Sequence, residues 1–409
     1  MFPHSNKQEE IGAGVFERRL LFKTELIKIL FLSCSKKVSY NQFAGELEDK
    51  CSIVQTSMRQ FVLDENTPSD INYLQYVTND TMPCLTLLNN FNNSIYLYDA
   101  LNGDIMDSIH FEKEGANGVG TIQGYYYHND DSIFIYPYAT GRVYMANRQS
   151  KVLQCYHLYN VDSVLEDTVH FLPVPFMETR LPMFYWNGRL MLSAGFMFDS
   201  SLEKKDNLFV CMTYKLHTGH TDFALPYPEV YRRYNWGNGE MFYRQPAVTM
   251  TDKGELLYSF PTSHEIWRYN STTGRIDSIY AGSNMIRQIV PFSTQKEVIP
   301  NEVPGHVISE WYYSQPSYEG IWADPYKGFY YRIARLPNPN HQRNTFNDKP
   351  VIVIVLDSSL HYIGEERLPE GVSYDTFNCY VSNEGLHIHI RNSRDEDHLT
   401  FYTYHAEYM

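Results

Sequence analysis

From about residue 70 onward the chain consists of short runs in which apolar and polar residues alternate, separated by polar turns. Three of these runs share one pattern, in which a Tyr inside an alternating strand is followed five residues later by a turn Gly. The pairs are Tyr98 with Gly103, Tyr214 with Gly219, and Tyr269 with Gly274. Alternation places one set of side chains between sheets, and Gly supplies the positive φ of a tight turn. We therefore expect β-hairpins here, with Gly103 and Gly274 at positive φ.

Less regular hairpins fill the intervals, so that a similar unit recurs every 40 to 60 residues or so, as in a β-propeller. The predicted blades are 70–111, 118–158, 168–225, 240–281, 305–367 and 372–405. The last blade lacks an outermost strand, which Ile53–Leu63 could supply to close the ring. No segment of the presumed propeller shows convincing helical periodicity. The sequence thus predicts an all-β, six-bladed β-propeller with four-stranded antiparallel blades closed by an N-terminal strand; two packed sandwiches are the alternative.

The first 69 residues divide into a leader-like segment, 1–34, and a segment, 35–69, that carries the closing strand; the propeller occupies 70–409. The stretch Leu26–Cys34 is apolar and ends in a small residue followed by Cys, which is typical of a lipoprotein signal peptide. Cys34 would then be lipidated. Lys28 and the acidic residues before it depart from that pattern, so the alternative is an amphipathic helix, Phe16–Leu32, with Cys34 unmodified.

The composition excludes some classes of function but does not identify one. Aromatic residues make up 15% of the chain, which suits half-buried strands, and the formal net charge is −14. This charge argues against binding to nucleic acid or to an anionic membrane surface. The six cysteines are scattered singly, which indicates neither a disulfide framework nor a zinc site. His387 and His389 alternate on one strand but lack a third ligand, so we expect no metal and no cofactor.

No catalytic motif is present, and we name no catalytic residue. The candidates for ligand binding lie instead in two aromatic segments that join blades, Tyr227–Arg244 and Glu310–Trp322. They are Tyr234, Trp236, Arg232, Arg233, Arg244, Trp311 and Trp322. Aromatic faces beside Arg donors suit a sugar or an acidic ligand. We expect these residues to line one mouth of the central channel; the alternative is that the first segment plugs the space between blades and the second packs as an inner strand.

The hairpins, exemplified by Ile266–Ile279, and the stretch Leu32-Ser33-Cys34-Ser35 give the chain a family resemblance over about residues 20 to 409. It resembles the uncharacterised six-bladed propeller lipoproteins, TolB-like and NHL-like, of Bacteroidota. The resemblance implies a bacterial cell-envelope location, lipid-anchored or periplasmic. It also implies O-glycosylation at Asp-Ser or Asp-Thr before an apolar residue. The acceptors would be Ser108, Ser132, Ser163, Thr168 and Ser278.

Two functions remain open at this point. The first is a non-catalytic binding or scaffold propeller that recognises a glycan, a peptide or a partner protein at its axial face. The second is a propeller enzyme acting on carbohydrate or a lactone through axial carboxylates. A broad aromatic face would favour binding, and several carboxylates converging on the axis would favour the enzyme.

Overall fold

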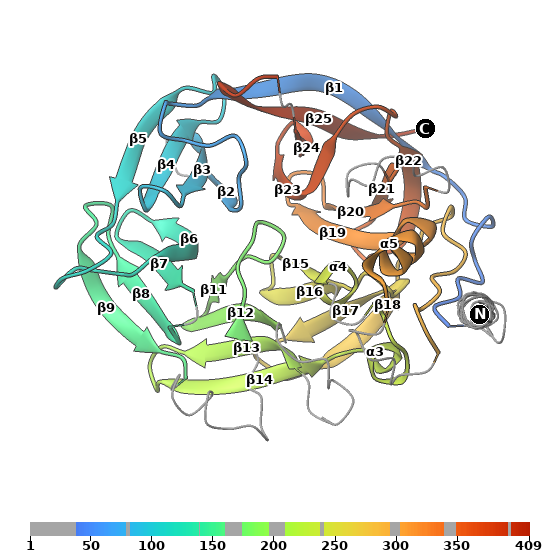
Figure 1. The fold of residues 1–409 in the computed structure, drawn as a ribbon, viewed down its shortest axis with the longest axis horizontal. Coiled ribbons are helices and arrows are strands. Elements are labelled where there is room, and N and C mark those ends of the chain that lie inside the picture. Colours follow the sequence, from blue (N-terminus) through green and yellow to red (C-terminus); the bar gives the residue numbers. More distant parts are fainter. Residues whose placement is uncertain are drawn as a thin grey trace, which may run out of the picture.

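The computed structural model describes most of the chain. The described residues are 38–78, 82–138, 140–159, 174–195, 209–237, 241–294, 303–338, 349–391 and 394–409. Cys34, Ser163 and Thr168 lie outside them. Six antiparallel sheets surround a central axis in chain order, each with one strand at the axis and one at the rim (Figure 1).

The blades are numbered along the chain. Blade one holds β2 (Leu74–Thr78), β3 (Pro83–Asn89), β4 (Ser94–Asp99) and β5 (Ile105–His110). Blade two holds β6 (Ile122–Asn129), β7 (Ser132–Pro137), β8 (Arg142–Ala146) and β9 (Val152–His157). Blade three holds β10 (Val174–Pro175), β11 (Phe184–Trp186), β12 (Arg189–Gly195), β13 (Phe209–Lys215) and β14 (His220–Pro226). In this blade both β10 and β11 pair with β12.

The remaining blades repeat the four-stranded pattern. Blade four holds β15 (Ala247–Met250), β16 (Glu255–Ser259), β17 (Glu265–Asn270) and β18 (Ile276–Tyr280). Blade five holds β19 (Ser317–Asp324), β20 (Phe329–Arg335), β21 (Val351–Leu356) and β22 (Tyr362–Arg367). Blade six holds β23 (Tyr374–Ser382), β24 (Gly385–Ile390), β25 (His398–Tyr408) and, outermost, β1 (Cys51–Val62). The predicted six-bladed propeller is confirmed.

The ring is closed by β1, which pairs antiparallel with β25 along its whole length, from Cys51 opposite Tyr408 to Val62 opposite His398. Its end also contacts blade one, because the Val62 amide donates to the Gly103 carbonyl at 3.1 Å. Joining the first strand to the last blade leaves no gap in the ring. Closure by an N-terminal strand, as the sequence predicts, is confirmed.

The repeated hairpin also has its predicted backbone, with φ of 84° at Gly103 and 72° at Gly274. In the described part of the chain, three short helices lie in the connections between blades: α3 (Glu229–Arg233), α4 (Met241–Arg244) and α5 (Gly305–Ser314). In α5 the side chains of Trp311, Tyr312 and Tyr313 are buried while most of the rest of the helix faces solvent. Tertiary packing of these three rings, rather than a long periodic apolar face, therefore stabilises the helix.

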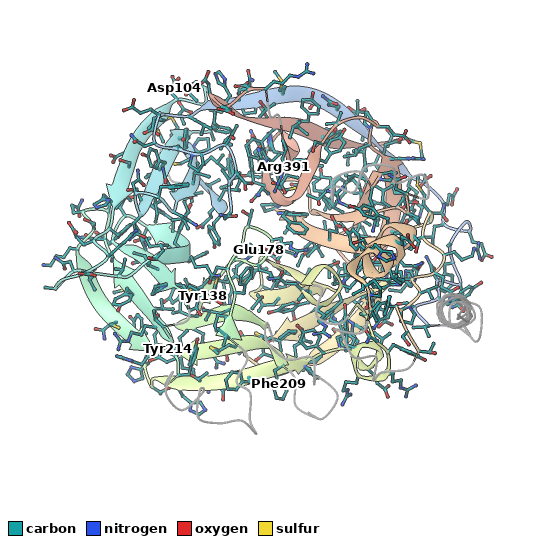
Figure 2. The ribbon with its side chains drawn as sticks, viewed as in Figure 1. Asp104, Tyr138, Glu178, Phe209, Tyr214 and Arg391 are labelled. Carbon is teal, nitrogen blue, oxygen red and sulfur yellow. The ribbon has the colours of Figure 1, made fainter. Side chains whose placement is uncertain are left out.

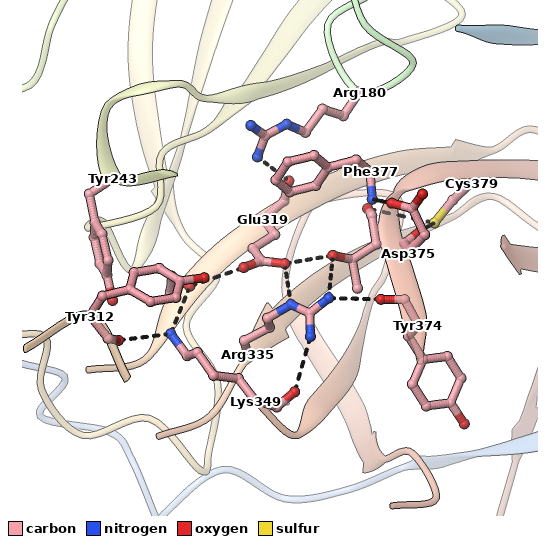
Figure 3. A network of polar contacts seen from close by, with 12 residues as sticks. Arg180, Tyr243, Tyr312, Glu319, Arg335, Lys349, Tyr374, Asp375, Phe377 and Cys379 are labelled. Carbon is pink, nitrogen blue, oxygen red and sulfur yellow. Dashed lines mark hydrogen bonds and ion pairs between the residues drawn. The ribbon is translucent and has the colours of Figure 1, made fainter. Parts of the chain in front are cut away.

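Charged groups are also buried between blades five and six, where Figure 3 shows a polar network. Arg335 donates to the Glu319 carboxylate at 2.8 Å, and Thr376 donates to the same oxygen at 2.6 Å. Lys349 donates to the carbonyl of Gln315 at 2.6 Å. Burial lowers the pKa of Lys349 to about 7. These pairs tie β19, β20 and β23 to the end of α5, which fixes the wall of the channel. Within the described part of the chain, no helix is long and apolar enough to cross a bilayer.

Candidate functional site

A loop between β10 and β11 crosses the axis of the propeller. Figure 2 shows Glu178, from this loop, near the centre of the ring. Thr179 accepts a hydrogen bond from the Leu74 amide of blade one at 3.0 Å and donates to Asn378 of blade six at 2.6 Å. Met177 packs against Gly124 of blade two, where an added Cβ would come within 2.5 Å of the Met177 side chain. The loop therefore bridges blades on opposite sides of the ring.

Arg180 holds the same loop to the other side of the channel. Its backbone carbonyl accepts from the Val248 amide of blade four at 2.9 Å, and its guanidinium donates to Gln245 at 3.2 Å. The guanidinium also lies 3.5 Å from the ring centre of Phe377 in blade six (Figure 3). We call residues 177–183 the axial loop.

An axial cavity of about 920 Å³ lies on one side of this loop. All six blades contribute to its lining through their innermost strands, and Thr179, Pro182 and Met183 of the axial loop also line it. The rim includes the turns between the first and second strands of blades four and five and the turn between the third and fourth strands of blade five. We call this side the turn face and the opposite side, where the chain enters each blade, the joining face. The aromatic lining residues are Tyr76, Tyr126, Phe184, Trp186, Trp322, Tyr326, Phe329, Tyr330 and Tyr380.

Trp186 is the half-exposed tryptophan of this lining. It ends β11, and the turn Asn187-Gly188 follows with φ of 48° and 73°. Its ring lies against Gly254 of the next blade, where an added Cβ would come within 2.2 Å of the indole nitrogen. Sequence reasoning missed this residue. The signal was present, because Asn-Gly after an apolar run marks a tight hairpin and places the preceding residue at the tip of a strand.

Another part of the wall is a stack of rings. Tyr76 of blade one lies parallel to Tyr380 of blade six, with centroids 5.3 Å apart, and Tyr380 lies parallel to His387 at 4.2 Å. His387 also contacts the Ser382 hydroxyl at 2.7 Å. Burial lowers the pKa of His387 to about 3, so the imidazole at the end of the stack is neutral.

Two carboxylates are found among the described lining residues, Asp252 and Asp324. The Asp324 side chain is buried and engaged in its own turn: it accepts from the Tyr326 and Lys327 amides at 3.0 Å and from the Tyr331 hydroxyl at 3.2 Å. Asp252 is exposed beside Lys253 at the rim. The cavity wall is therefore aromatic and hydroxyl-rich, with its few charges close to balance.

The tryptophans predicted to stack a ligand lie elsewhere. Trp236 and Trp311 are each 2% exposed. Both pack on Tyr243, with ring centroids 6.2 and 4.8 Å away, and their indole N–H groups donate to the carbonyls of Val230 and Val290. The two joining segments do meet, as expected. However, they form a buried aromatic plug, in which the rings pack on one another and the indole N–H groups are hydrogen-bonded. The prediction of a ligand platform at Trp236 and Trp311 is therefore wrong.

The other predicted residues are dispersed. Trp322 does line the axial cavity, with its ring folded over Gly320 of the same strand. Arg232 and Arg233 are exposed on α3, where Arg233 pairs with Glu229, and Tyr234 and Arg244 are half-buried. The structure thus brings Trp322 to the cavity and leaves the arginines in the connection that carries α3 and α4.

The surface candidates for modification are partly accessible. Ser108 in β5 and Ser278 in β18 are exposed on outermost strands, and Ser132 in β7 is half-buried. Their O-glycosylation stays a prediction. The described residues contain no cluster of His, Cys, Asp and Glu that could hold a metal ion.

Comparisons with known proteins agree on the fold. A family model described as a domain of unknown function, DUF4221, matches residues 51–367. A solved member of that family from Bacteroides vulgatus is 19% identical, covers 88% of this chain and 99% of its own, and superposes with a TM-score of 0.73. A Bacteroides fragilis protein described as a "putative exported protein" is 10% identical over 87% of this chain and 95% of its own, with a TM-score of 0.50. No curated protein matches.

Proposed function

This chain belongs to the DUF4221 family, and we propose that it is a binding propeller whose ligand enters the axial cavity from the turn face. The observation that carries the proposal is the aromatic cavity itself, formed by all six blades on one side of the axial loop. Its size of about 920 Å³ lies at the upper end of small-ligand pockets. A ligand there would contact several blades at once.

The lining favours a carbohydrate over other small ligands. Trp186 and the surrounding tyrosines offer flat apolar faces for the C–H side of a sugar ring, and Thr, Ser and Tyr hydroxyls can exchange hydrogen bonds with sugar hydroxyls. Ligand hydroxyls would replace water at these groups without an unpaired charge being buried.

The same lining favours binding over hydrolysis. A glycosidase needs two carboxyl groups about 5 to 10 Å apart across the scissile bond. Among the described lining residues, the Asp324 carboxylate is already engaged by two backbone amides and the Tyr331 hydroxyl. Asp252 is the one other carboxylate of the described cavity lining, so we place the enzyme alternative second.

The location belongs to the proposal as well. A related fold from Bacteroides fragilis bears an exported description, and Leu26–Cys34 has the pattern of a lipoprotein signal. We therefore place the protein at the bacterial cell envelope, anchored through Cys34. Intact-mass measurement of the protein from its native host should show a diacylated Cys34 and no residues 1–33; a product retaining those residues would contradict the anchor.

The proposed function is tested by screening the full chain on a glycan array and titrating the best neutral glycan into three proteins: wild type, Trp186→Ala and Trp267→Ala. Trp267 is a half-buried tryptophan of β17 outside the cavity lining, which makes it the matched control. Losing one stacking ring should weaken binding about tenfold or more. Trp267→Ala should retain the wild-type affinity. A Trp186→Ala protein that binds like wild type, or an array with no bound glycan, would overturn the proposal.

A further inference from the structure

A second, smaller hollow of about 100 Å³ opens beside the axial cavity, between blades four and five. The two spaces share a set of lining residues, which shows that they are contiguous: Thr251, Asp252, Lys253, Tyr330, Ser358 and Ser359. The smaller hollow adds Glu255, Leu257, Arg268 and Leu360. We call it the side pocket.

The edge of the side pocket is held in place by two rigid turns. In blade four, the Thr251 hydroxyl accepts from the Glu255 amide at 3.1 Å and presents Asp252 at the tip. In blade five, the Asp357 carboxylate accepts from the amides of Ser359 and His361 at 2.8 and 2.9 Å. These bonds hold the turn that places the exposed residues Ser358 and Ser359 at the other edge. Such preorganised polar groups cost little entropy on binding.

The charges that line the side pocket are balanced, because Asp252 and Glu255 are matched in number by Lys253 and Arg268. The Arg268 guanidinium donates two hydrogen bonds of 2.8 Å to Asp277 and lies 4.0 Å from the Glu255 carboxylate. Burial, together with Asp252 and Glu255, raises the pKa of the Tyr330 hydroxyl, which keeps its proton. A recess lined by balanced charges and hydroxyl oxygens favours an uncharged group that exchanges hydrogen bonds over a carboxylate.

Size sets a further limit. At about 100 Å³ the side pocket is far smaller than the axial cavity of about 920 Å³. It suits a small exocyclic substituent of a ligand, such as a hydroxymethyl or acetamido group, while the body of the ligand lies in the axial cavity.

From this contiguity, polarity and size we infer that the ligand of the axial cavity is an uncharged saccharide that inserts one exocyclic hydroxymethyl or acetamido group into the side pocket. The inference rests on the proposed function and adds the ligand class and the residues that select it. Asp252, Ser358 and Ser359 act as specificity-determining groups, while Trp186 supplies affinity to any sugar ring.

The test uses probes that differ at the exocyclic group alone. Cellotriose and xylotriose share a backbone, and only cellotriose carries hydroxymethyl groups; chitotriose adds acetamido groups. Calorimetric titration of the full-length wild type should show at least one of cellotriose and chitotriose binding about tenfold or more tightly than xylotriose, since about 1.4 kcal/mol corresponds to tenfold. In Ser359→Tyr, which fills the pocket, the affinities should converge to within about threefold because the extra contacts are lost.

Ser57→Tyr, at an exposed position of β1 far from the cavity, is the matched control and should keep the wild-type preference. A preference that survives in Ser359→Tyr, equal binding of all probes by wild type, or no binding at all overturns the inference. If Trp186→Ala still weakens binding while Ser359→Tyr leaves the preference intact, the proposed function stands and only the selection by the side pocket is wrong.

Discussion

The Thr179 hydroxyl donates a hydrogen bond of 2.6 Å to Oδ1 of Asn378, which belongs to a blade on the opposite side of the ring. The same hydroxyl accepts from the Leu74 amide. One side chain of the axial loop thus connects blades three, six and one at the axis. Because Thr179 also lines the axial cavity, the stability of the ring and the shape of the binding site depend on the same contact.

Replacing this hydroxyl should destabilise the whole propeller. Thr179→Val keeps the shape of the side chain but leaves the Leu74 amide and the Asn378 oxygen without their partner in a buried site. We expect a loss of about 1–3 kcal/mol in the free energy of unfolding. Urea unfolding followed by circular dichroism measures it. Thr179→Ser retains the hydroxyl and should lose less than half as much; equal losses would show that the methyl group contributes as much as the hydrogen bonds and would contradict the prediction.

The two hairpin glycines should respond differently to the same substitution. At Gly274 an added Cβ has no neighbour within 4 Å, so Gly274→Ala should cost about 1 kcal/mol from the positive φ alone. At Gly103 the Cβ would lie 2.0 Å from the Gln60 carbonyl oxygen of β1. This steric overlap adds to the cost of the positive φ, so Gly103→Ala should lower the free energy of unfolding by about 2–4 kcal/mol. Thermal unfolding of the two variants should rank them in this order, and a reversed order would refute the packing of β1 on this turn.

The sequence was sufficient for the architecture because the repeat that defines a blade is local. Tyr98 and Gly103 lie in one hairpin, so their spacing reports the turn directly. The candidate functional site was harder to predict from the sequence. Thr179 and Asn378 are 199 residues apart, and no local pattern joins them. The Asn-Gly turn after Trp186 marked that residue as the tip of a strand, whereas only packing decides that Trp236 is covered by Tyr243.

Acid should destabilise the fold through His264, which joins the N-terminal segment to blade four. This buried imidazole donates from Nε2 to the Ser39 carbonyl at 2.7 Å, and Nδ1 accepts from the Tyr318 hydroxyl at 2.8 Å. Burial lowers its pKa to about 4. Between about pH 6.5 and pH 4 the unfolded chain therefore binds a proton that the native state does not, and stability falls as the pH falls through this window.

The measurement is the unfolding free energy of wild type and His264→Gln from pH 7 to pH 4. The advantage of wild type over the variant should shrink by about 1–3 kcal/mol across the window. His217→Gln, at an exposed position, is the control and should track wild type. A wild-type advantage that stays constant with pH would show that His264 does not titrate in this way.

O-glycosylation of the serines on the blades should follow how exposed each serine is. Ser108 and Ser278 lie on outermost strands and Ser132 is half-buried, so a bulky glycan fits the first two more readily. Glycopeptide mass spectrometry of the protein from its native host should find occupancy at Ser108 or Ser278 above that at Ser132. Bare hydroxyls at both exposed positions would contradict the prediction.

The most direct test of the central claim is a crystal structure of the full chain soaked with the best neutral saccharide from the array. The account predicts difference density for a sugar ring on the turn face, against the Trp186 indole, with an exocyclic group between Asp252 and Ser359. Density on the joining face beside α3 and α5, with the axial cavity holding only solvent, would contradict it.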